Sequence, residues 1–175
     1  MQLTQAISLL QSAVPAETGE WADIGAGTGL FTQALDQILG AGSTVFALDK
    51  NPHSLWYLRL QHAQLRVEEG DFTRKLLLPV LSGMVMANAL HYAPNPGAVL
   101  TNLRAHLKPE GRLVLVEYDT DRPNPPWVPF PISRARLPEI AMPAGFAAPT
   151  FTADMPSAFG HAQIYVAVLE VGDGE

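Results

Sequence analysis

The chain has 175 residues, and its 47% hydrophobic and 16% charged residues are typical of a globular domain with a sizeable core. The formal net charge of −6 argues against a protein that grips a nucleic-acid backbone, and the absence of cysteine excludes disulfides and thiolate metal sites. Because neither a secretory leader nor an apolar run long enough to span a bilayer is present, we expect a cytoplasmic protein. We also expect no bound metal.

The first part of the chain begins with a predicted helix and then alternates strands with helices. Apolar residues recur at helical spacing from Leu3 to Val14, and a short apolar strand later ends at Asp23 and enters a glycine-rich turn. The elements expected after that turn are a helix over 31–39, a strand over 44–48, a helix from Pro52 to about His62 capped by Asn51, a strand over 65–68, a strand with its exit over 85–90, and a helix capped by Asn95 that contains Leu107 and stops at Pro109.

The second part of the chain is rich in proline. Residues 113–118 form an apolar run that predicts a central parallel strand, covered on both faces. The proline-rich segment 122–131 is expected to be an irregular loop. A helix from about Ser133 to Met142 is predicted next, followed by strands near 150–153 and 162–171 that form an antiparallel hairpin at the sheet edge.

The alternation over residues 20–118 predicts an α/β fold with a parallel sheet and right-handed crossovers. In such sheets, ligands bind beyond the carboxyl ends of the strands. Several polar residues are expected at that edge, each directly after a strand: Asp23, Asp49, Asp71, Asn88 and Asp119.

The turn itself carries the most specific signal in the sequence. Gly25, Gly27 and Gly29 alternate after Asp23, whereas a dinucleotide-binding turn has its third glycine one residue later, where this chain has Leu30. The pattern D-x-G-x-G-x-G resembles motif I of the class I S-adenosylmethionine-dependent methyltransferases. The resemblance covers residues 19–118 well, extends in outline to the stretch 157–165, and points to the ubiquinone/menaquinone-biosynthesis-like, type 11 group.

This resemblance implies a three-layer Rossmann-like methyltransferase fold with a seven-stranded, mostly parallel sheet. The seventh strand would be antiparallel and inserted between the fifth and the sixth. We expect one methyltransferase domain over 1–175, divided into a leader helix (1–18), a cofactor-binding half (19–118), and a substrate-side loop with the C-terminal hairpin (119–175).

Binding of S-adenosylmethionine is expected at the strand ends. Asp49 is placed to accept two hydrogen bonds from a ribose diol, although a helix-capping role is an alternative for it and for Asp71. The turn could also be a tight connection without a ligand. The residues that the resemblance assigns to the cofactor are Asp23, Gly25, Ala26, Gly27, Thr28, Gly29, Leu48, Asp49, Lys50, Gly70, Asp71, Phe72 and Asn88.

The catalytic and acceptor residues are less well marked. Where the family often has an acid at the start of the fourth strand, this chain has Ser82 and Gly83. His91 and Tyr92 are expected near the methyl group, with His91 as a candidate general base and a structural role as its alternative. Candidate acceptor-binding residues are Trp127, Phe130, Phe159, Arg134 and Arg136, which could equally anchor the loop or form a solvated helix face.

The expected function is methyl transfer from S-adenosylmethionine to a small-molecule acceptor, mainly by alignment of the two molecules. S-adenosylhomocysteine would be the product. One alternative is a protein that binds this cofactor without transferring the methyl group. An NAD(P)-dependent oxidoreductase is a weaker alternative, because Leu30 replaces the third glycine and no Tyr-x-x-x-Lys pair occurs.

Overall fold

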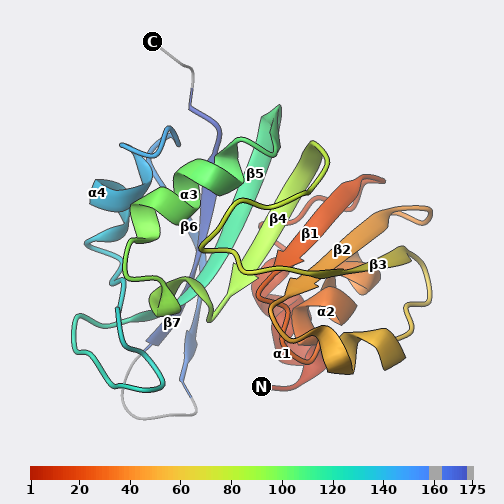
Figure 1. The fold of residues 1–175 in the computed structure, drawn as a ribbon, viewed down its shortest axis with the longest axis horizontal. Coiled ribbons are helices and arrows are strands. Elements are labelled where there is room, and N and C mark those ends of the chain that lie inside the picture. Colours follow the sequence, from red (N-terminus) through yellow and green to blue (C-terminus); the bar gives the residue numbers. More distant parts are fainter. Residues whose placement is uncertain (158–162, 173–175) are drawn as a thin grey trace.

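The computed structural model describes residues 1–157 and 163–172. Its described part contains a seven-stranded sheet in the order β3-β2-β1-β4-β5-β7-β6 (Figure 1). The strands are β1 (Glu20–Ile24), β2 (Thr44–Asp49), β3 (Gln64–Glu69), β4 (Leu81–Ala87), β5 (Leu107–Asp119), β6 (Thr150–Pro156) and β7 (Gln163–Glu170).

The strand directions confirm the predicted topology. The neighbouring pairs from β3 through β5 are parallel, whereas β7 runs antiparallel to both β5 and β6. The seventh strand therefore lies between the fifth and the sixth, and β6 forms the edge of the sheet. The connection between the two strands of the predicted hairpin includes residues 158–162, which fall outside the described residues.

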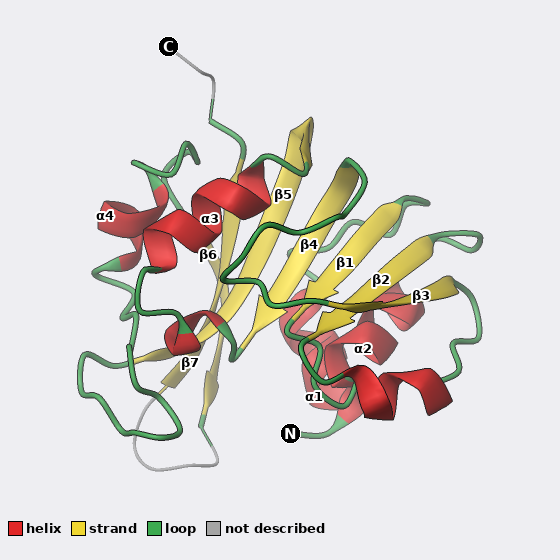
Figure 2. Ribbon diagram, viewed as in Figure 1, coloured by secondary structure: helices red, strands yellow, loops and turns green. Residues whose placement is uncertain are grey.

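Helices cover both faces of the sheet, which gives the three layers of an α/β fold (Figure 2). On one face, α1 (Leu3–Leu10) and α2 (Leu30–Ile38) pack in a cluster with the buried valines of the central strands. On the other face, α3 (Pro96–Arg104) and α4 (Leu137–Ala141) share a cluster with the methionines of β4 and the leucines of β5. None of the helices in the described residues is long and apolar enough to cross a membrane, and the cytoplasmic location stays a prediction.

An extended segment takes the place of a helix between β3 and β4. Leu76 and Leu78 belong to the same buried cluster as Ile24 of β1 and Leu48 of β2, so this segment helps to cover that face of the sheet. The intervening Leu77 points outward and is 90% exposed.

The predicted helix from Pro52 to His62 is wrong. Residues Pro52–Tyr57 form a short 3₁₀ helix, η1, and Asn51 makes no side-chain cap. The chain does not continue as a helix to His62, because the carboxylate of Asp36, in α2, accepts hydrogen bonds at 2.8–2.9 Å from three successive backbone N–H groups. These donors belong to Gln61, His62 and Ala63.

Other boundaries also differ from the prediction. Asn95 does cap α3, accepting from the Ala98 N–H at 3.1 Å, but Leu107 lies in β5, because it pairs with Leu81 of β4. That pairing extends β5 through Pro109 and starts β4 before residue 85. The leader helix ends at Leu10. Of the helix predicted from Ser133 to Met142, only Leu137–Ala141 is α-helical, after a turn over residues 133–136.

Candidate functional site

The glycine turn joins β1 to α2 as the sequence predicts, and its backbone requires glycine. Gly25, Gly27 and Gly29 have φ angles of +73°, +55° and +84°. A Cβ on Gly25 would lie 2.8 Å from the Ala89 Cβ, and one on Gly29 would lie 2.6 Å from a methyl of Leu58. At Gly27 a Cβ would meet no atom within 4 Å, so the turn leaves open space there.

Asp49 ties this turn to the end of β2. Its Oδ2 accepts the Gly27 N–H at 2.8 Å, and its Oδ1 accepts the Asn51 N–H at the same distance. A carboxylate has about four lone-pair sites, so each oxygen retains capacity for a ligand hydroxyl. The neighbouring Leu48 accepts at its carbonyl from the N–H groups of Gly25 and Ala26, which places the turn beside β2.

Asp23 lies in β1 beneath the turn, and its side chain is buried. The Thr32 hydroxyl donates to its Oδ2 at 2.7 Å. Burial raises the pKa of Asp23 to about 7, the hydrogen bonds with Thr32 oppose this rise, and the nearby charge of Asp49 adds to it. A cation brought to this carboxylate would favour its ionised form.

The segment from Gly70 to Phe72 follows β3 and lies beside the glycine turn. An added Cβ on Gly25 would lie 3.4 Å from the Phe72 ring, and one on Gly70 would lie 3.2 Å from Leu48. Asp71 accepts from both the N–H and the hydroxyl of Thr73, which holds its pKa below the usual range. Asp71 thus caps a local turn while remaining at the rim of the site.

Asn88 follows β4 and has an uncommon backbone conformation. Its φ is +50°, and its N–H donates to the Val116 carbonyl at 2.8 Å. Among the described residues, its Oδ1 atom is buried without a hydrogen-bond partner. A buried polar atom without a partner is uncommon in native proteins and points to a ligand donor.

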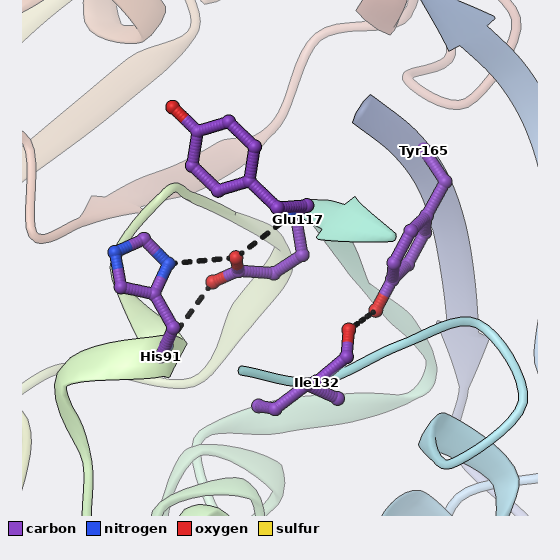
Figure 3. A network of polar contacts seen from close by, with 5 residues as sticks. His91, Glu117, Ile132 and Tyr165 are labelled. Atoms are coloured by element: carbon purple, nitrogen blue, oxygen red, sulfur yellow. Dashed lines mark hydrogen bonds and ion pairs between the residues drawn. The ribbon is translucent and has the colours of Figure 1, made fainter. Parts of the chain in front are cut away.

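His91 is paired with an acid that the sequence prediction missed. Its Nδ1 lies 2.8 Å from Oε2 of Glu117, its backbone N–H donates to Oε1 at 3.2 Å, and both side chains are buried (Figure 3). The imidazole packs against the rings of Tyr92 and Tyr118, with centroids 4.5 and 5.8 Å away. Glu117 interrupts an apolar strand, and that interruption was the signal, since a buried carboxylate needs a partner.

The predicted acceptor residues lie after β5. Trp127 and Phe130 are exposed, and the Phe130 N–H donates to the His91 carbonyl at 3.0 Å. Arg134 is ion-paired with Asp154, and its guanidinium lies over the rings of Phe151 and Tyr165. Asp119 accepts from the Arg134 N–H, and Arg136 donates to the Pro131 carbonyl, so both have structural partners. Phe159 lies outside the described residues.

Comparison with known proteins identifies the family. Residues 22–113, which include the glycine turn and Asn88, match the family described as Methyltransferase domain. The chain belongs to this family. The predicted membership of the class I S-adenosylmethionine-dependent methyltransferases is confirmed, whereas the narrower ubiquinone/menaquinone-like group stays a prediction.

The chain is similar to individual proteins in sequence, and to a solved structure in fold. The crystal structure of Burkholderia thailandensis 1,6-didemethyltoxoflavin-N1-methyltransferase, with bound 1,6-didemethyltoxoflavin and S-adenosylhomocysteine, superposes with a TM-score of 0.77 at 20% identity, covering 98% of this chain and 78% of that one. The highly reducing polyketide synthase pkhB of Emericella nidulans is 40% identical over 62 residues, which are 35% of this chain and 2% of the synthase. An uncharacterized 37.1 kDa protein in transposon TN4556 of Streptomyces fradiae is 27% identical over 184 aligned positions, covering 93% of this chain and 53% of that protein.

Proposed function

We propose that the protein transfers a methyl group from S-adenosylmethionine to a small-molecule acceptor. The observation that carries this proposal is the hydrogen bond from the Gly27 N–H to Asp49, made across a turn of three glycines with positive φ. It brings an acid suited to a ribose diol next to an open backbone surface that no side chain fills.

The residues at this edge match the parts of the cofactor. Asp49 would accept from the ribose hydroxyls, and Leu48, Asp71 and Phe72 would border the adenine. Asp23 would stabilise the ammonium of the methionine portion, because its buried carboxylate lacks a cationic partner among the described residues. The unpaired Oδ1 of Asn88 offers a further acceptor to that ammonium.

The chain contributes alignment and a base to the transfer. When bound, S-adenosylmethionine supplies a methyl group that its sulfonium already activates. Glu117 accepts from Nδ1–H of His91, so Nε2 keeps its lone pair and can take a proton from an acidic acceptor group.

Titration with S-adenosylhomocysteine tests the cofactor assignment. At a hundredfold excess over its dissociation constant, it should raise the free energy of unfolding by about 2.7 kcal/mol. Asp49→Ala should remove most of this gain, whereas Asp121→Ala, at an exposed acid after β5, should preserve it. Stabilisation by NADH in place of S-adenosylhomocysteine would support the oxidoreductase alternative and contradict the proposal.

A second measurement separates an enzyme from a protein that only binds the cofactor. The purified protein is incubated with S-adenosylmethionine and a broad panel of hydroxylated, amino and carbon-acid acceptors, and S-adenosylhomocysteine formation is followed. Acceptor-dependent formation supports transfer. Tight cofactor binding with no turnover on the whole panel favours the alternative.

A further inference from the structure

Three exposed aromatic side chains lie on the turn that contains His91 and on the loop after β5. Tyr92 is 46%, Phe130 41% and Trp127 69% exposed, although side chains of this size usually bury most of their surface. Tyr92 packs its ring on His91, and Phe130 is hydrogen-bonded to the His91 carbonyl. The proline-rich loop after β5 therefore lies beside the short helix η2 (Leu90–Tyr92) at the lower left of Figure 1.

These aromatic residues do not anchor the loop. Val128 and Ile132 do so, being 9% and 1% exposed, and the Ile132 carbonyl accepts from the buried Tyr165 hydroxyl at 2.9 Å (Figure 3). The loop backbone is also tied to itself, since the N–H groups of Trp127 and Val128 both donate to the Asn124 carbonyl. The rings are thus exposed on a fixed backbone, which is the arrangement of a preorganised binding surface.

The position of the loop fits a substrate and not a remote partner. The Phe130 N–H fixes the loop to the main chain of the residue whose imidazole is paired with Glu117. Tyr118, directly after Glu117, also packs near this imidazole, with the ring centroids 5.8 Å apart. Aromatic rings stack preferentially on flat π systems, so the surface around His91 favours a flat ligand.

We propose that the methyl acceptor is a planar aromatic molecule with a weakly acidic hydroxyl, held by Tyr92, Trp127 and Phe130. This assignment rests on the proposed methyltransferase function. Nε2 of His91 takes the hydroxyl proton while the acceptor oxygen forms the new bond to the methyl carbon. The bond between sulfur and that carbon breaks with its electron pair on sulfur, giving S-adenosylhomocysteine and the methyl ether, and His91 releases its proton to solvent.

The test compares two ligands with the same carbon skeleton and hydroxyl position, one aromatic and planar and the other saturated. Protein saturated with S-adenosylhomocysteine is titrated calorimetrically with 2-naphthol and with decahydro-2-naphthol, its saturated counterpart. We expect 2-naphthol to bind at least about tenfold more tightly, and Trp127→Ala and Phe130→Ala each to weaken it by about three- to tenfold. Trp56→Ala is the matched control, because Trp56 is similarly exposed, at 57%, but lies on η1 after β2.

The outcomes of these titrations distinguish the proposed aromatic acceptor from the proposed methyltransferase function. Equal affinity for both ligands, no binding of either to the saturated protein, or an equal effect of Trp56→Ala and Trp127→Ala overturns the aromatic acceptor. These results leave cofactor binding intact. Failure of the wild type to bind S-adenosylhomocysteine in the same calorimeter overturns the proposed function itself.

Discussion

Glu117 holds His91 by two atoms at once. One carboxylate oxygen accepts the His91 backbone N–H at 3.2 Å, and the other lies 2.8 Å from the ring Nδ1. The acid comes from β5 and the histidine from the turn after β4, so the pair joins neighbouring parallel strands at their carboxyl ends. A ring fixed at both its main chain and Nδ1 has one orientation and one favoured tautomer.

Glu117→Gln is therefore expected to impair the base while leaving cofactor binding unchanged. The amide can donate to Nδ1 as well as accept from it, so the tautomer with the Nε2 lone pair loses its preference. We expect kcat to fall about a hundredfold, with the affinity for S-adenosylhomocysteine unaltered. Nitrogen NMR of the imidazole at pH 8 should show Nδ1–H in the wild type and a mixture in the variant. An unchanged tautomer would argue that Glu117 is structural only.

Two glycines provide a matched test of the open turn. Gly27 and Gly42 both have positive φ, at +55° and +84°, and an added Cβ would meet no atom within 4 Å at either. Each alanine variant should lower the free energy of unfolding by about 1–2 kcal/mol through backbone strain alone. Only Gly27→Ala should also weaken S-adenosylhomocysteine binding, by tenfold or more, as measured calorimetrically. Equal binding by both variants would place the cofactor elsewhere.

Asp36 is expected to be the main support of the segment between η1 and β3. Desolvation would raise the pKa of this carboxyl, but three backbone N–H hydrogen bonds outweigh it and hold the pKa below its usual value. Asp36→Asn should lower the free energy of unfolding by about 1–3 kcal/mol at pH 7. Since the folded-state pKa is depressed, this difference should shrink as the pH falls through it. Chemical denaturation at several pH values measures both effects, and a pH-independent difference would contradict this account.

The features that were predicted correctly from the sequence are those determined by residues close together in the chain. The glycine spacing identified the turn, and the Asn95–Pro96 pair identified the start of α3, because caps and turns are determined within a few residues. The end of η1 could not be found in the same way. It depends on Asp36, which precedes the segment it holds by 25–27 residues.

The geometry of the candidate site was predictable at the glycine turn and at Asp49, but it was incomplete around His91. Asp49 follows a strand in a recognisable pattern, whereas the pairing of Glu117 with His91 spans 26 residues and two strands. The exposure of the Trp127 and Phe130 rings could not be predicted, since a sequence cannot distinguish an exposed ring from one that anchors a loop. Val128 and Ile132 proved to be the anchors.

Asp23 should make both stability and cofactor binding depend on pH near neutrality. Burial raises its pKa to about 7 in the folded protein, whereas an aspartate in the unfolded chain titrates near 3.9. Between these values the folded state binds a proton that the unfolded state does not. This group therefore makes the free energy of unfolding decrease by about 1.4 kcal/mol per pH unit as the pH rises from about 4 to 7. Asp23→Asn should remove that decrease, as seen in denaturant titrations of both proteins across the range.

Because the ligand ammonium favours the ionised carboxylate, the wild-type affinity for S-adenosylhomocysteine should increase as the pH rises through 7 and remain flat in Asp23→Asn. A wild-type affinity without this rise would mean that Asp23 does not face the ammonium.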